Sequence, residues 1–149
     1  MDKYERRIFI IAGIMLVVFL TAMMRAVSKG LSDLPACIPY DPSYLEPRVT
    51  ALDENTYQVF MVAQMWSFQP SEVFIPVGAE VDFYLTTKDV VHGFHISGKN
   101  VDMMAVYGGI NKTTVKFDEP GIYPIVCHEY CGSGHQHMKA DVIVNYPNK

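Results

Sequence analysis

The chain has little cysteine and no excess of basic charge. Its three cysteines, Cys37, Cys127 and Cys131, are odd in number and do not suggest a disulfide framework. The sequence contains no Cys-x-x-Cys-His motif, so it carries no signature for covalently attached haem. From Gly30 onward, 14 Asp and Glu residues outnumber 7 Lys and Arg residues. Because nucleic acids bind basic surfaces, we expect no nucleic-acid partner, whereas a basic protein partner is electrostatically favoured.

Long hydrophobic runs are also scarce, and the clear one lies near the N-terminus. Ile8 to Met24 contains 17 residues without a charge, which as a helix would extend about 25 Å. Because the Arg25 side chain can reach out of the apolar layer, the run can continue to Val27 and approach the roughly 30 Å of a bilayer core. A cleaved signal peptide would have a shorter apolar region, about 7–15 residues, before a small-residue cleavage site. We therefore expect residues 1–29 to form a retained transmembrane anchor.

The rest of the sequence lacks sustained helical periodicity, internal repeats and low-complexity tracts. Residues 30–48 contain four prolines, a density that opposes regular helix and favours an extended linker. Residues 49–149 contain short runs rich in β-branched and aromatic residues, several with period-two alternation, separated by turns. The expected strands cover residues 56–62, 72–76, 81–86, 91–97, 101–106, 113–117, 122–127 and 140–145. Their spacing predicts an all-β sandwich or barrel.

Metal-ligating side chains are concentrated in the loop between the last two expected strands. Cys127, Cys131, His135 and Met138 lie within twelve residues of one another. Thiolate, imidazole and thioether together favour copper, because soft sulfur ligands select copper, zinc or iron–sulfur clusters. A disulfide between the two cysteines is an alternative. A zinc site is another, although methionine has no place in the usual zinc ligand set.

Two copper arrangements are compatible with this loop. A single-copper electron-transfer site uses one cysteine, two histidines and a weak axial methionine. It would leave Cys127 unused and would take its second histidine from an earlier strand, either His92 or His95. Alternatively, the two thiolates can bridge two copper ions, with Met138 and the backbone carbonyl of Glu129 as weak ligands. The other histidines are expected at the surface or around the ligands: His95, His128 and His137.

The combined pattern resembles the dinuclear copper A site of cytochrome c oxidase subunit II. Cys127-x-Glu129-x-Cys131-x3-His135-x2-Met138 is preceded by Asp89-Val90-Val91-His92, and the likeness extends over the whole chain. The resemblance implies a cupredoxin-like Greek-key β-barrel over residues 49–149, with one N-terminal transmembrane helix. It also implies the ligands of the two copper ions: His92, Cys127, Glu129 through its carbonyl, Cys131, His135 and Met138.

This resemblance carries expectations about function. In that family, subunit II accepts electrons one at a time from cytochrome c and passes them to the haem of subunit I, while oxygen is reduced on another subunit. The chain would then be the electron-accepting subunit of an oxidase in the bacterial plasma membrane, with its copper domain on the outer face. The alternative is a membrane-tethered single-copper cupredoxin carrier. A copper-delivery protein fits less well, because that class has a βαβ pattern that this sequence lacks. Nitrous oxide reductase has a large second domain, for which this chain is too short. A quinol oxidase subunit II would have the barrel without these copper ligands.

The sequence departs from the better-known members in having one predicted span rather than two. An outward-facing copper domain then requires a cytoplasmic N-terminus. The slight excess of Lys3, Arg6 and Arg7 over Arg25 and Lys29 agrees with this orientation. The resemblance is to compact oxidases, in which a separate small single-helix subunit supplies the other helix.

Two further roles are implied by the family. Trp66, with Phe68 nearby, lies in the segment where many members carry an aromatic run near the place at which electrons enter from cytochrome c. Packing inside the barrel is the alternative for these aromatic residues. A carboxylate at the position of Glu129 binds magnesium or manganese at the subunit I interface in many relatives. Cys37 has no assigned role.

Overall fold

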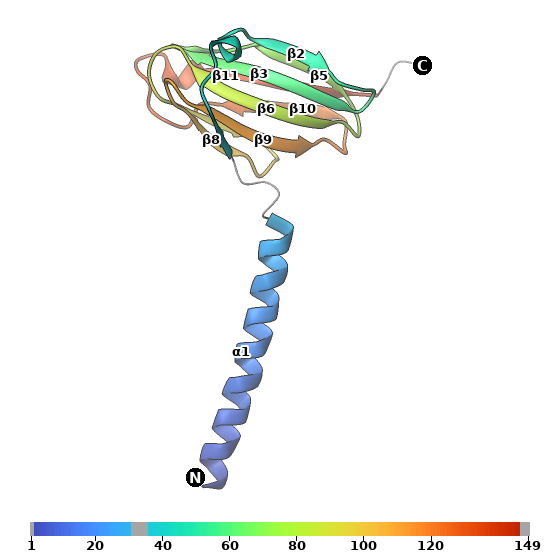
Figure 1. The fold of residues 1–149 in the computed structure, drawn as a ribbon, viewed down its shortest axis with the longest axis vertical. Helices are drawn as coiled ribbons and strands as arrows, with labels where there is room; N and C mark the ends of the chain where they lie inside the picture. Colours follow the sequence, from blue (N-terminus) through green and yellow to red (C-terminus); the bar gives the residue numbers. More distant parts are fainter. Residues whose placement is uncertain (1, 31–35, 147–149) are drawn as a thin grey trace. The chain divides into compact units, whose positions relative to one another are not determined.

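The computed structural model describes residues 2–30 and 36–146, which belong to two separate compact units, one within residues 1–34 and one within residues 35–149. The first unit is helix α1 (Lys3–Gly30) (Figure 1). Its N-terminus is capped by Asp2, whose carboxylate accepts hydrogen bonds from the backbone N–H groups of Tyr4 and Glu5 at 2.7 and 2.9 Å. Within Lys3–Ser28, an 18-residue stretch has a mean hydropathy of 2.4, and the segment is long and apolar enough to cross a membrane. The apolar helix expected from the sequence is therefore present.

The second unit consists of two β-sheets that pack face to face (Figure 1). The first sheet has the strand order β1 (Ala36–Ile38), β9 (Ile110–Lys116), β6 (Glu80–Thr87), β3 (Thr56–Gln64) and β2 (Arg48–Ala51), with β4 (Ser67–Gln69) also paired to β3. The second sheet has the order β5 (Glu72–Pro76), β11 (Lys139–Asn145), β10 (Gly121–Val126), β7 (His92–Ile96) and β8 (Asp102–Ala105). Neighbouring strands are antiparallel except for the parallel pairs β3–β6 and β5–β11. The all-β architecture expected from the sequence is confirmed.

The hydrophobic core lies between the two sheets. Alternate side chains of β6 point inward, so that Val81, Phe83 and Leu85 are fully buried. The Phe83 ring lies 6.0 Å from that of Phe94 on β7 and 6.4 Å from that of Phe117, measured between centroids. Aromatic contacts at this separation add to the stability gained from burial. The contact between Phe83 on β6 and Phe94 on β7 connects the first sheet to the second.

Residues 36–48 also contribute to the second unit. Strand β1 pairs with β9, and the short 3-10 helix η2 (Pro42–Leu45) lies against β3 and β6. The Tyr44 ring of η2 contacts the Phe60 and Tyr84 rings, with centroids 5.2 and 5.4 Å apart. The Arg48 guanidinium lies 3.6 Å from the Phe60 ring centroid. Much of the segment 30–48, expected from the sequence to be a linker, is thus paired or packed on the β-sandwich. Proline density did not prevent this, because a short edge strand and one helical turn need few backbone donors.

Candidate metal centre

The loop of residues 127–138 connects β10 to β11 at one end of the second sheet. Val126, the last residue of β10, pairs with His95 on β7 and with Lys139 on β11. The start of β7 and both ends of the loop therefore lie close together. Within the loop, the Cys127 N–H donates to the Met138 carbonyl at 3.2 Å, and residues 135–137 form the short 3-10 helix η3 (His135–His137). The sheet pairing and these internal hydrogen bonds fix the loop between two strands.

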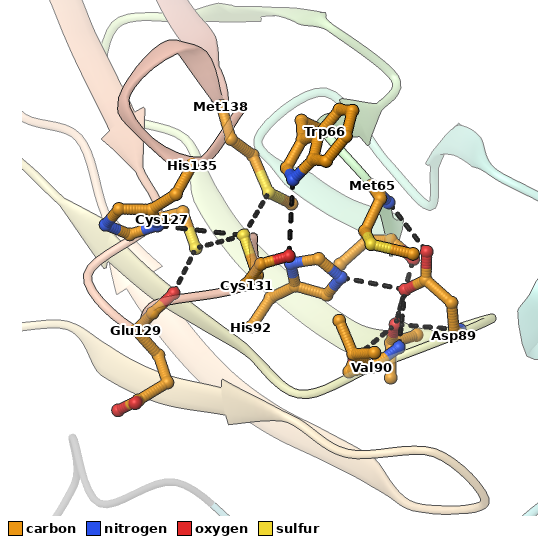
Figure 2. A network of polar contacts seen from close by, with 12 residues as sticks. Met65, Trp66, Asp89, Val90, His92, Cys127, Glu129, Cys131, His135 and Met138 are labelled. Atoms are coloured by element: carbon orange, nitrogen blue, oxygen red, sulfur yellow. Dashed lines mark hydrogen bonds and ion pairs between the residues drawn. The ribbon is translucent and has the colours of Figure 1, made fainter. Parts of the chain in front are cut away.

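This arrangement brings together all six residues that the sequence suggested as copper ligands (Figure 2). The Sγ atoms of Cys127 and Cys131 are 3.8 Å apart, and a ring nitrogen of His92 lies within 4.8 Å of both. Cys131 Sγ is 3.6 Å from His135 Nδ1 and 3.8 Å from Met138 Sδ. Cys127 Sγ is 3.2 Å from the carbonyl oxygen of Glu129. Both cysteines are free, and their sulfur separation far exceeds the bond length of about 2.05 Å in a disulfide.

The sulfur ligands are shielded from water. Cys127, Cys131 and Met138 are buried, with exposed fractions of 8, 6 and 2%. Burial raises the pKa of Cys131 to about 11, and the neighbouring Cys127 thiol contributes in the same direction. The metal-free site therefore holds a protonated thiol at neutral pH, and a metal ion that binds there must displace a proton.

His92 shows the clearest sign that this site is built for a metal ion. The side chain is fully buried, and its Nε2 lies 2.8 Å from Asp89 Oδ1. Its other ring nitrogen, Nδ1, is buried and has no hydrogen-bond partner among the described residues. Buried polar atoms in proteins are usually paired, so an unpaired imidazole nitrogen beside two cysteines indicates a position suited to binding a metal ion. The donor set fits copper better than zinc, because it includes the thioether of Met138.

The structure adds contacts that sequence reasoning missed. The indole Nε1–H of Trp66 donates to the carbonyl of Cys131 at 3.2 Å. The indole also lies so close to the loop that a Cβ on Gly132 or Gly134 would meet it at 3.1 or 2.4 Å. The sequence points to Asp89 only as part of a motif, although its carboxylate contacts His92. The glycines at 132 and 134 are a signal of close packing, but they do not show which side chain packs there.

The remaining residues singled out from the sequence lie outside the cluster. His95 and His128 both face Asp102, with nitrogen–oxygen distances of 3.5 and 3.2 Å, and His137 is exposed. Phe68 is fully buried, and its ring meets that of Phe94 edge to face at 5.6 Å, so packing in the core accounts for it. Cys37 is exposed on β1, with its thiol 3.0 Å from Asn111 Oδ1.

Comparison with known proteins agrees with this geometry. Residues 42–145 match the family model described as cytochrome c oxidase subunit II, periplasmic domain. Two proteins from Thermus thermophilus, both named cytochrome c oxidase subunit 2, are each 34% identical over 112 residues. The aligned region is 74% of this chain and 83 or 67% of those proteins.

Two solved structures also contain chains that are similar to this one. A cryo-EM structure of a heme-copper terminal oxidase dimer contains a chain 35% identical to this one, with a TM-score of 0.78, and the match covers 96% of this chain and 100% of that one. The periplasmic domain of subunit II of cytochrome oxidase from Bradyrhizobium japonicum is 22% identical, with a TM-score of 0.55 over 62% of this chain and 84% of that one. The latter likeness concerns the fold alone.

The fold and the site define a membrane-anchored protein whose cupredoxin-like domain carries a candidate copper centre. Its two cysteines and His92 are the kind of ligands that a copper A site uses. The chain belongs to the cytochrome c oxidase subunit II family and is a subunit of a haem-copper oxidase, in which it associates with other oxidase subunits.

Proposed function

We propose that this chain is the electron-accepting subunit of the oxidase. It would take electrons one at a time from cytochrome c at a dinuclear copper A centre and deliver them to the haem of subunit I. The observation that carries this proposal is the pair of cysteine sulfurs 3.8 Å apart with His92, His135 and Met138 around them. A single-copper carrier is not favoured, because it would leave one of two buried, adjacent thiols without a function.

The ligands that we propose are atoms that lie close together in the structure. Cys127 and Cys131 would hold the copper through Sγ, and His92 and His135 would each bind through Nδ1. Met138 Sδ and the Glu129 carbonyl would be the weak ligands. Copper held in this way would supply one-electron chemistry. The domains proposed for this function are an anchor over 1–29 and a copper domain over 49–149, to which residues 36–48 of the expected linker 30–48 add β1 and η2.

The protein contributes rigidity and exclusion of water. The loop is closed by the hydrogen bond from Cys127 N–H to the Met138 carbonyl, and β10 and β11 hold both of its ends. A ligand set that cannot rearrange keeps the reorganisation cost of electron transfer low. Burial of the sulfurs tunes the potential of the bound metal, because the hydrophobic shell controls solvent access.

Trp66 is the residue at which we propose that electrons enter. It is 42% exposed, and its indole N–H contacts the Cys131 carbonyl directly. The Trp66 side chain alone therefore extends from the protein surface to Cys131, a proposed copper ligand. Phe68 lies in the core and is not part of this proposal.

A second metal is proposed at Glu129. Its carbonyl faces Cys127, whereas its carboxylate points away from the sulfurs (Figure 2). The carboxylate is exposed beside a pocket of about 410 Å³ lined by Val90, Val91 and Tyr130. In this position the carboxylate would bind magnesium or manganese at the interface with subunit I, apart from the copper ligands.

The location we propose is the bacterial plasma membrane. Helix α1 would span it with the N-terminus in the cytoplasm, so that the copper domain lies on the outer face, where cytochrome c is found. A separate small single-helix subunit would complete the membrane part of the complex. The acidic balance of residues 30–149 suits a basic donor protein.

The experiment is to mix the copper-loaded full chain with reduced cytochrome c and to follow both proteins by stopped-flow absorbance. We expect one equivalent of cytochrome c to be oxidised per chain. Trp66→Leu should slow the reaction while copper content stays constant. The absence of electron transfer to a fully copper-loaded chain would contradict the proposed function.

A further inference from the structure

The turn between β3 and β4, formed by Met65 and Trp66, makes one hydrogen bond to Cys131 and one to Asp89, the residue that contacts His92 (Figure 2). On one side, Trp66 Nε1–H donates to the Cys131 carbonyl at 3.2 Å. On the other side, the Met65 N–H donates to Asp89 Oδ2 at 2.7 Å, and Asp89 Oδ1 lies 2.8 Å from His92 Nε2. The turn therefore bridges His92, at the start of β7, and Cys131, in the loop after β10.

The Asp89 carboxylate is held in place by groups other than His92. Its oxygens accept hydrogen bonds from the backbone N–H groups of Met65 and Val90, both at 2.7 Å, and lie 3.1 Å from the Thr87 hydroxyl. Each carboxylate oxygen of Asp89 therefore already accepts a backbone N–H group, and the orientation of the carboxylate is set before His92 is considered.

This acceptor determines where His92 carries its proton. Both carboxylate oxygens accept backbone N–H groups, so the carboxylate acts as a hydrogen-bond acceptor, and the imidazole nitrogen that faces it is the one that donates. In the neutral ring, a proton on Nε2 leaves the lone pair on Nδ1, the buried nitrogen without a partner among the described residues. The lone pair is thus on the nitrogen that is free to bind a metal beside the sulfurs.

We propose that Asp89 is a positioning residue, which holds His92 in its Nδ1-ligating tautomer before copper binds, and that the Met65–Trp66 turn ties this histidine to the Cys131 loop. The proposal rests on the proposed function only in taking His92 as a copper ligand. The tautomer itself can be observed in the metal-free chain. A failure of the proposal is therefore distinguishable from a failure of copper to bind at all.

Replacement of Asp89 by asparagine separates positioning from packing, because the two side chains have almost the same shape. If the amide oxygen faces His92, the amide NH2 faces the Met65 N–H, two donors at a spacing of 2.7 Å. If the oxygen faces Met65, the NH2 faces His92 and favours a proton on Nδ1. Either orientation disturbs one half of the link.

The experiment uses the full chain in detergent, metal-free and with reduced thiols, with ¹⁵N-labelled histidine. Long-range ¹H–¹⁵N correlation assigns the tautomer of His92. We expect the Nε2–H tautomer in the unmodified chain and a populated Nδ1–H tautomer in Asp89→Asn. Copper affinity, measured by competition with a chelator of known affinity, should fall about tenfold or more in Asp89→Asn.

A matched control is Asp102→Asn, which removes a carboxylate that also contacts two histidines, His95 and His128, neither of them a proposed ligand. It should leave the His92 tautomer and the copper affinity unchanged. An Nδ1–H tautomer in the unmodified chain would overturn the proposal even if Asp89→Asn failed to fold. An Asp89→Asn variant with unchanged tautomer and copper affinity would overturn it as well.

The second half of the proposal is tested by Trp66→Phe, which keeps a ring over the loop but removes the indole N–H. The His92 tautomer should stay the same, and the reduction potential of the copper-loaded chain should shift, because hydrogen bonds around the ligands tune the metal. An unchanged potential would contradict the tie between the turn and the Cys131 loop.

Discussion

At the scale of single residues, Cys127 supplies the sulfur that separates the two copper arrangements, since its Sγ lies 3.8 Å from that of Cys131. We expect Cys127→Ser to abolish the dinuclear centre. The remaining Cys131, His92, His135 and Met138 are the one-cysteine, two-histidine, axial-methionine set of a single-copper site. The variant should bind one copper ion per chain and show hyperfine splitting from one nucleus by electron paramagnetic resonance. Two bound coppers with a shared spin in this variant would show that Cys127 is not a bridging ligand.

Gly134 is a second residue with a specific expectation. A Cβ there would lie 2.4 Å from the indole of Trp66, so Gly134→Ala must move either the loop or the indole. Forced overpacking of this kind costs about 1–3 kcal/mol. The chain has a single tryptophan, so its fluorescence reports this contact directly. We expect a lower melting temperature and a red-shifted emission.

Gly109→Ala is the matched control, because its Cβ would meet its nearest neighbour, the Val106 carbonyl oxygen, at an ordinary 3.5 Å. It should change neither the emission nor the melting temperature by more than a small amount. Equal behaviour of the two variants would mean that the Trp66 contact is loose in solution.

The candidate ligands that the structure brings together were predictable because most of them form a short local pattern. Five of the six fall within residues 127–138, and their spacing already limits the chemistry. The role of Asp89 was not predictable in the same way. The orientation of Asp89 depends on a hydrogen bond from the backbone N–H of Met65, which lies in the turn between β3 and β4. The identity of the Met65 side chain does not predict this backbone contact.

At the scale of secondary-structure elements, β1 and η2 extend the β-sandwich to residues before 49. The Tyr44 ring of η2 and the guanidinium of Arg48, the first residue of β2, contact Phe60 on the outer face of β3, which is only 6% exposed. We expect a fragment of residues 49–149 to be less stable than one of residues 36–149 by about 2 kcal/mol, because it lacks the Tyr44 ring contacts and the Arg48 guanidinium over Phe60. Urea unfolding of the two fragments measures the difference.

Copper binding provides the control for that comparison. All six proposed ligands lie between residues 92 and 138, so both fragments should bind the same amount of copper. Equal unfolding free energies would contradict the structural role of β1 and η2 and would support a boundary at residue 49.

The main strands were predictable where alternation was strong, and the expected strand 72–76 coincides with β5. β10 (Gly121–Val126) begins one residue earlier than the expected strand 122–127. β1 and η2 were missed for a physical reason. Their stability comes from long-range contacts, such as the pairing of Cys37 with Asn111, rather than from a pattern within the proline-rich segment itself.

At the scale of the whole molecule, charge makes a prediction about the partner. Residues 30–149 carry twice as many acidic as basic residues, and exposed charges are screened over about 8 Å at physiological ionic strength. The second-order rate of electron transfer from a basic cytochrome c should therefore fall steeply as salt is added. Stopped-flow measurements from low to high salt test this. A rate independent of salt would show that acidic residues do not guide the encounter.

Together, the loop of residues 127–138 and His92 are proposed to hold two copper ions that share one unpaired electron. The most direct measurement is the copper content of the purified, copper-loaded full chain together with its electron paramagnetic resonance spectrum. We predict two coppers per chain and hyperfine splitting from two equivalent nuclei. One copper per chain, with four-line splitting from a single nucleus, would contradict a dinuclear centre.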